Sequence, residues 1–146
     1  MLTNWIGGVL AVVATVLVQY QAQILLAGVI GRVRRGPGST ALQRLAAWHL
    51  TLFVVFGLIF CHLAQVGVWA LLYVALGEMT GFADAMFFSL ASLAGVSAET
   101  LELSRGHRVL GAVQSTVGIL MFGWSTALLV ALIGRAGRDA GTGAAG

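Results

Sequence analysis

Three long apolar stretches, and one that is too short to cross a bilayer, constrain this fold more than any other feature. The long stretches cover residues 5–31, 45–76 and 107–134, and the last includes 25 consecutive uncharged residues, Val109 to Ile133. A helix needs about 20 apolar residues to cross the hydrocarbon core, so each long stretch can span it. Residues 83–93 form the short stretch. We therefore expect an all-α membrane protein with three transmembrane helices.

Composition excludes several other classes. Hydrophobic residues make up 59% of the chain, charged residues 9%, and the mean hydropathy is +0.96, which is far from soluble globular composition. The basic residues are all arginines beside apolar stretches, without interleaved aromatics, so we expect no nucleic-acid binding. The single cysteine, Cys61, has no partner for a disulfide within the chain. No zinc-type spacing, phosphate loop or nucleophile–base pair occurs, so we predict no enzyme, metal site or cofactor.

The remaining segments complete a single membrane domain, residues 1–146. No positive charge precedes the first stretch, which argues against a signal peptide. Residues 32–44 form a basic linker rich in Gly and Pro, and such residues end helices and permit turns. Residues 135–146 are rich in Gly and Ala, and we expect a disordered tail there.

Arginine placement predicts the orientation. Six of the eight arginines lie in the linker or in the tail, and the positive-inside rule places both segments in the cytoplasm. The N-terminus and residues 77–106 are then external. Arg105 and Arg108 run against the rule but are outnumbered.

The region from the short stretch to the third long one suggests a re-entrant loop. A half-length helix at 83–93 is followed by a polar, Gly-containing reversal at 94–104 and then by the spanning helix, 107–134. Irregular backbone at membrane depth is stable only when it is buried in protein or lines a water-filled cavity.

Several of these segments resemble the potassium-channel superfamily. The run Ala85-Met-Phe-Phe-Ser-Leu resembles its pore helix, and residues 107–111 and 118–127 with Gly134-Arg135 resemble its inner helix. Residues 62–77 resemble its outer helix. The similarity covers about residues 48–135 and is closest to small bacterial two-pore-domain-type channels with an extra N-terminal helix. It implies a homotetrameric pore with residues 94–104 as a filter-like loop, in a bacterial inner membrane.

The filter departs from that family. Where a T-T-V/L-G-Y-G-D sequence would stand, this chain has Ala94-Gly-Val-Ser-Ala-Glu-Thr100. Ser97 and Glu99 replace the two glycines, which readily take φ > 0 and so let successive carbonyls face the ion. Ala98 replaces the aromatic residue, and only the apolar Val96 is retained. We therefore expect no standard potassium sites, and weakly selective or divalent-permeable conduction instead.

Acidic residues supply the candidate ion-binding groups. Four copies of Glu99 around a symmetry axis would form a carboxylate ring, a device of cation channels, and Glu102 could form a second ring further out. The alternative is that both are solvated charges at an external vestibule. Gly95 and Ser97 could present oxygens to a cation or only let the loop turn. The filter candidates are Gly95, Val96, Ser97, Ala98, Glu99 and Glu102.

One face of the third long stretch carries mostly small residues. They recur at intervals of four, three, four and three, as Gly111, Ser115, Gly118, Phe122 and Ser125. Small residues allow helices to approach closely, so packing is one interpretation. In the other, Ser115, Gly118, Phe122 and Ser125 line a cavity, with Phe122 as a constriction.

Four further polar residues are candidates for a functional or structural role. His62 lies mid-span, where ionisable groups are functional candidates; a hydrogen bond to Gln65 or to the glutamines of the first stretch is the alternative. Asp84 is expected in the first turn of the half-helix, and His107 at the membrane interface. His49 and His62 are 13 residues apart and face nearly opposite sides of one helix, which argues against haem ligation.

The predicted function is passive conduction of monovalent or divalent cations across the bilayer. The alternative is a structural or regulatory membrane subunit that keeps the channel fold without conducting.

Overall fold

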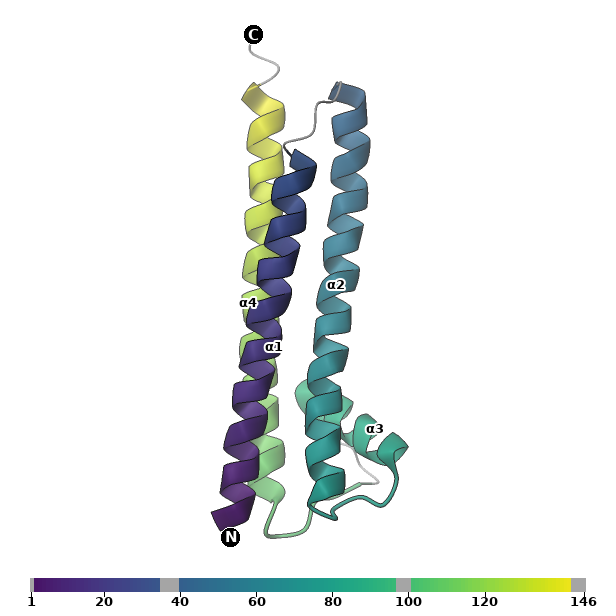
Figure 1. The fold of residues 1–146 in the computed structure, drawn as a ribbon, viewed down its shortest axis with the longest axis vertical. Coiled ribbons are helices and arrows are strands. Elements are labelled where there is room, and N and C mark those ends of the chain that lie inside the picture. The colour runs from purple at the N-terminus through teal and green to yellow at the C-terminus, as the bar shows by residue number, and fades with distance from the viewer. Residues whose placement is uncertain (1, 35–39, 97–100, 143–146) are drawn as a thin grey trace.

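Four helices make up the described part of the chain. The computed structural model describes the backbone of residues 2–34, 40–96 and 101–142, and the side chains of residues 5–32, 49–96 and 101–131. The helices are α1 (Leu2–Arg34), α2 (Thr40–Ala75), α3 (Phe82–Leu93) and α4 (Arg108–Thr142). Figure 1 shows the three long helices side by side, with the short α3 at the end where α2 finishes and α4 begins.

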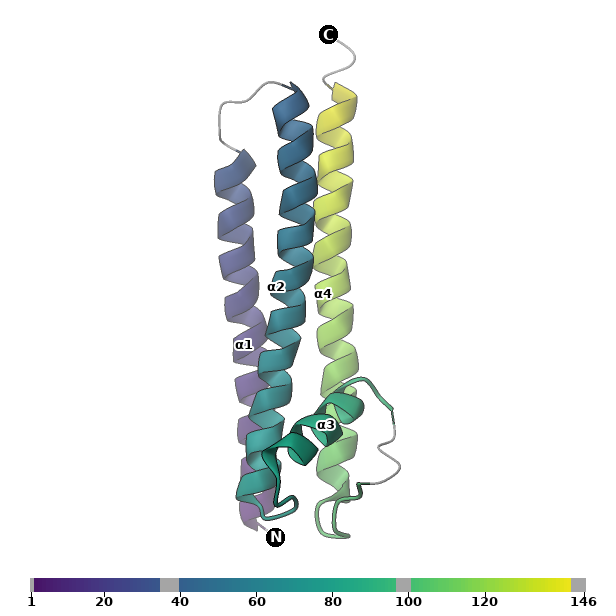
Figure 2. The same cartoon turned by 90° about the vertical axis from the view of Figure 1, so that its right-hand side faces the viewer.

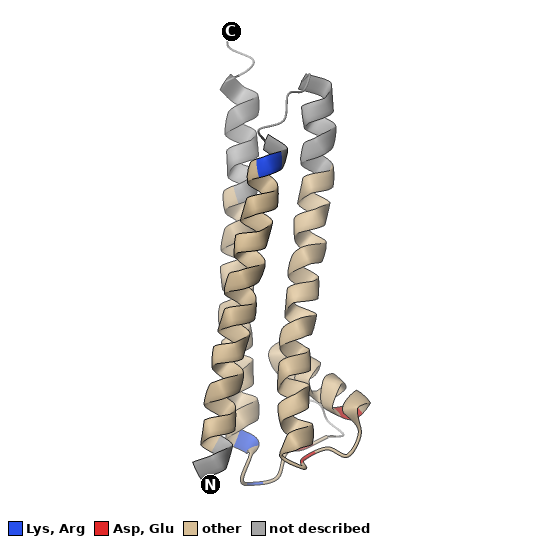
Figure 3. Ribbon diagram, in the orientation of Figure 1, with Lys and Arg blue, Asp and Glu red and all other residues tan. Residues whose placement is uncertain are grey.

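The expected all-α architecture with three long apolar helices is confirmed. Trp5–Arg32, His49–Ala75 and Arg108–Ala131 are each long and apolar enough to cross a membrane. Figure 3 shows the charged residues of the described part at the two ends of the long helices and none along their middle. Many large apolar side chains on these helices are exposed in the single chain, and lipid or another protein chain is the environment that stabilises such a surface.

The long helices extend further than predicted. α2 begins at Thr40 rather than at residue 45, and α4 continues to Thr142. The prediction of a disordered tail from residue 135 was therefore wrong up to residue 142. Alanine and arginine favour helix, and each interior glycine costs only about 1 kcal/mol relative to alanine. A helix can thus continue past the apolar stretch because it satisfies its own backbone hydrogen bonds.

Two apolar clusters hold the long helices together. The cluster at the α3 end contains Trp69, Tyr73, Phe88 and Leu110, with the rings of Tyr73 and Phe88 edge to face at 5.2 Å. The second cluster joins α1 and α2 further along, through residues Leu26, Ile30, Val54 and Leu58.

A glycine turn ends α2 and redirects the chain toward α3. Gly77 has a positive φ of 70°, which side chains disfavour. Its N–H bonds the carbonyl of Val74, and the next N–H, of Glu78, bonds the carbonyl of Tyr73. This is the Schellman pattern of a helix C-terminus, and it leaves Glu78 at the same end of the bundle as α3.

Candidate functional site

The segment around α3 leaves one end of the bundle and returns to it. A Cβ atom added to Gly118 would overlap the carbonyl of Leu93, so the C-terminal end of α3 abuts α4 at that glycine. Gly118 lies ten residues into α4, about 15 Å along its axis. The chain then comes back, because the Ser104 N–H donates to Glu78 Oε2 over 2.6 Å. Figure 2 shows this inclined path of α3 beside α2 and α4.

Buried hydrogen bonds hold α3 between its two neighbours. The Ser89 hydroxyl donates to the carbonyl of Val66 on α2 over 2.8 Å. Gln114 on α4 donates to the carbonyl and hydroxyl oxygens of Ser89, at 3.0 and 2.7 Å. The Tyr73 hydroxyl in turn donates to Gln114 Oε1 over 2.7 Å. Sequence reasoning missed Tyr73, Ser89 and Gln114 as a group, although each is a polar residue within an apolar stretch.

The end of α3 is a second Schellman turn. Gly95 has a φ of 73°, its N–H bonds the Ser92 carbonyl, and the Val96 N–H bonds the Ala91 carbonyl. Of the two roles predicted for Gly95, the turn is therefore observed.

The other filter candidates divide into two groups. Ser97, Ala98 and Glu99 lie outside the described residues. Val96 is exposed, and Glu102 is an exposed side chain whose carboxylate lies 3.0 Å from the guanidinium of Arg108. Exposed ion pairs contribute little stability, and exposure in a single chain agrees with both predicted positions of Glu102, the ring and the surface charge.

The small-residue face of α4 packs against the chain's own helices. The Ser115 hydroxyl donates to the Ser92 carbonyl over 2.7 Å, and Gly118 meets Leu93. Ser125 is buried and accepts a hydrogen bond from Gln19 over 2.9 Å. Packing within the chain, one of the two interpretations, is thus observed for these three residues. Phe122 is exposed, and its ring lies 4.6 Å from that of His62.

A second polar cluster joins the three long helices. Gln65 on α2 donates to Gln19 Oε1 on α1 over 2.8 Å, and Gln19 donates to Ser125 on α4. His62 lies 3.2 Å from both Gln65 Oε1 and Ser125 Oγ. The predicted partnership of His62 with Gln65 is confirmed. Gln19, one of the glutamines of the first stretch, is therefore stable in an apolar segment because buried partners satisfy it.

Glu78 joins the two ends of the α3 segment. Its carboxylate accepts hydrogen bonds from the N–H and hydroxyl of Ser104, at 2.6 and 2.8 Å, and lies 2.6 Å from His107 Nδ1. Burial of the carboxylate opposes ionisation, but the bonds from Ser104 and His107 outweigh it and hold the pKa of Glu78 below its usual value. The ionised carboxylate is therefore the form that links the turn after α2 to Ser104 and His107 before α4.

Replacing Glu78 with Gln is expected to lower the thermal unfolding midpoint at pH 7, because a neutral amide accepts these hydrogen bonds more weakly. A lowered folded-state pKa stabilises the protein above the unfolded-state pKa, and the contribution disappears as pH falls through the lowered value. The difference between wild type and Glu78→Gln should therefore shrink below about pH 4. Calorimetry in micelles across pH 3–7 measures this difference in unfolding midpoint. A difference that does not depend on pH would contradict the stabilising role of the ionised Glu78 carboxylate.

Asp84, the remaining acidic candidate, lies at the start of α3. It is in the first turn, as expected, and Gly81 at the N-cap makes no side-chain cap. Within the described ranges, no group of three or more His, Cys, Asp or Glu side chains is arranged to hold a metal ion.

Comparison of the chain with protein-family models, with curated proteins and with solved structures gave no match.

Proposed function

We propose that the chain is one subunit of a passive cation channel, with α3 as a re-entrant pore helix and the following loop as its filter. The observation that carries this proposal is the path of the α3 segment. α3 ends against Gly118, about 15 Å below the start of α4, and the hydrocarbon core is about 30 Å thick. The segment thus enters to about half that depth and returns to Glu78, as a pore loop does.

Electrostatics favour a cation at the inner end of α3. A helix carries a partial negative charge of about half an elementary charge at its C-terminus, and that end is the deep one here. The acidic residues 78, 84, 99 and 102 all belong to the same 25-residue region of the sequence. Glu99 follows α3 closely in the chain, so several copies would supply the carboxylates that attract a cation.

Several copies of the chain are needed for such a pore. One chain contributes one α3 and one filter loop, and a ring of carboxylates needs one Glu99 from each subunit. The homotetramer, the bacterial inner membrane and the external N-terminus belong to this proposal; they rest on the family resemblance and on arginine placement. The exposed apolar sides of the long helices offer surfaces for neighbouring subunits and lipid.

Cation flux from liposomes tests the proposal. Purified protein under potassium, sodium and calcium gradients should pass monovalent ions with little discrimination, or admit calcium. Glu99→Gln should change calcium flux or ion preference at least severalfold, because it removes the ring's charge. Glu102→Gln is the matched control, since Glu102 is exposed and paired with Arg108, and it should have a smaller effect.

A non-conducting membrane subunit is the second candidate. The observation in its favour is that Ser115, Gly118 and Ser125 of α4 pack against the chain's own helices, which agrees with the packing interpretation of this face rather than with pore lining. Folded, oligomeric protein that passes no cation under any gradient would support this candidate and contradict conduction. Strong potassium selectivity would contradict the proposed carboxylate filter.

A further inference from the structure

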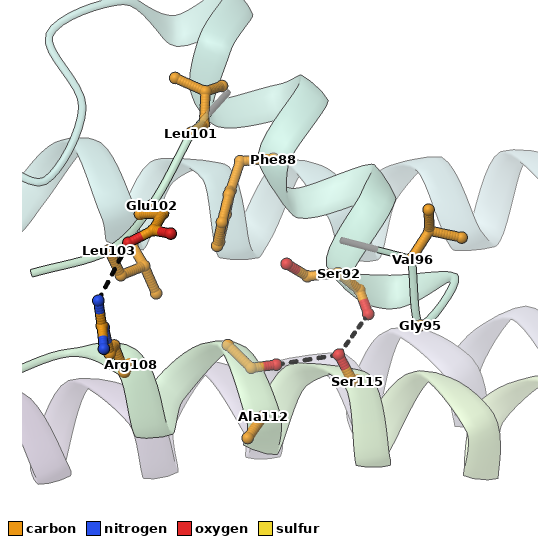
Figure 4. Close-up of a pocket in the computed structure, with 11 residues that line it drawn as sticks. Phe88, Ser92, Gly95, Val96, Leu101, Glu102, Leu103, Arg108, Ala112 and Ser115 are labelled. Carbon is orange, nitrogen blue, oxygen red and sulfur yellow. Dashed lines mark hydrogen bonds and ion pairs between the residues drawn. The ribbon is translucent and has the colours of Figure 1, made fainter. Parts of the chain in front are cut away.

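A pocket lies between the C-terminal half of α3, the chain that follows it and the first turns of α4. Its volume is ≈ 410 Å³, within the range of about 300–1,000 Å³ typical of small-molecule sites. Figure 4 shows α3 and α4 on two sides, with Leu101 and Leu103 closing a third. Binding there requires neither conduction nor assembly, so the inference does not depend on the proposed function.

One hydroxyl that faces this pocket, that of Ser92, makes no hydrogen bond with the described residues. Ser92 is only 8% exposed. Its carbonyl is occupied by the Ser115 hydroxyl and the Gly95 N–H, whereas its own hydroxyl makes no such bond. In Figure 4 the Ser92 hydroxyl oxygen points toward Phe88 and the interior of the pocket, away from Ser115. Because this hydroxyl oxygen is accessible from the pocket, it is free to form a hydrogen bond with a bound group that accepts or donates one.

The rest of the lining is apolar near this hydroxyl and electrically balanced further away. Phe88, Leu103 and Ala112 supply apolar walls. The two charged residues, Glu102 and Arg108, bind each other at 3.0 Å. A charged ligand would therefore lose its hydration without gaining a free counter-charge.

We propose that this pocket binds an uncharged amphiphile, with its apolar body against Phe88, Leu103 and Ala112 and one hydroxyl-type group on Ser92. A primary alkanol represents this chemistry. An alkyl carboxylate or alkylammonium ion of the same chain length should bind more weakly, because burial penalises its charge.

Photolabelling with an octanol that carries a diazirine in its alkyl chain tests the site on full-length protein in lipid nanodiscs. Mass spectrometry should find label concentrated on α3, residues 101–103 and the start of α4, and 1-octanol should displace it. Ser92→Ala should weaken competition by 1-octanol about two- to tenfold, the range for one hydrogen bond. Thr116→Val is the matched control: its exposed hydroxyl bonds only Ala112 of its own helix, so competition should be unchanged.

A second variant keeps the proposal falsifiable if Ser92→Ala fails to fold. Ala112→Phe should fill the pocket and abolish the labelling, whereas Ala127→Phe adds the same bulk at an exposed position of α4 outside the pocket and should preserve it. Equal labelling of all exposed helix faces would overturn the proposal. So would labelling that survives Ala112→Phe, or stronger competition by octanoate or octylammonium than by 1-octanol.

Discussion

Gly118→Val is expected to be among the most destabilising single substitutions in the chain. The Cβ atom would meet the backbone carbonyl of Leu93, and a backbone in a hydrogen-bonded helix end cannot move aside as a flexible side chain can. Overpacking of a tight contact costs about 1–3 kcal/mol, and we expect the upper end of that range. Unfolding by SDS in mixed micelles, followed by circular dichroism, measures the loss.

Gly123→Val is the matched control for this substitution. Gly123 lies on the same helix, and a Cβ added there meets no atom within 4 Å. Valine also has a higher helix propensity than glycine, so Gly123→Val should be neutral or slightly stabilising. Equal losses from the two variants would show that α3 does not abut α4 at Gly118.

Gln114→Leu is expected to produce the second large effect, because Gln114 is fully buried and bonds both Tyr73 and Ser89. Leucine has similar volume but leaves the Tyr73 hydroxyl without its acceptor. Stranding buried polar groups costs about 1–3 kcal/mol each, so we expect a total loss of about 2–4 kcal/mol in the same unfolding measurement. Thr126→Val is the control: this exposed hydroxyl bonds only Phe122 of its own helix, and the change should be within about 0.5 kcal/mol.

A double-variant cycle shows whether the loss comes from the hydrogen bond itself. Tyr73→Phe removes the donor that Gln114→Leu leaves unsatisfied, so the double variant should lose less than the sum of the single variants. Additive losses would mean that the two side chains are not coupled, and would contradict the observed contact as a source of stability.

Predictions that depend on local sequence agree well with the structure. The short apolar stretch at 83–93 corresponds to α3 at Phe82–Leu93, and Asp84 lies in its first turn as expected. The largest disagreement concerns the end of α4, which continues to Thr142. Apolarity stops near residue 134, but helix formation does not require apolar residues, so a change in hydropathy does not fix where a helix ends.

Predictions that depend on partners distant in the sequence were less complete. Close packing was one of two interpretations of the small-residue face of α4, and Gln114 was not singled out. Its partners Tyr73 and Ser89 are 41 and 25 residues away. The bond between Glu78 and Ser104 likewise joins residues 26 apart. No local pattern specifies which of several polar residues in apolar stretches will meet.

The sequence by itself determined the number of long apolar helices, the existence of one half-length helix and the positions of the charges outside the apolar stretches. These follow from stretch length and from the high cost of charge in an apolar medium, both of which are local properties. Only the tertiary structure decided the position along α4 at which α3 ends and the face of α4 that it contacts. The physical reason is that α4 carries apolar residues on all sides, and lipid and protein interiors accept these equally. Its packing face is therefore decided by the close fit at Gly118 and by the hydrogen bonds of Gln114 and Ser125.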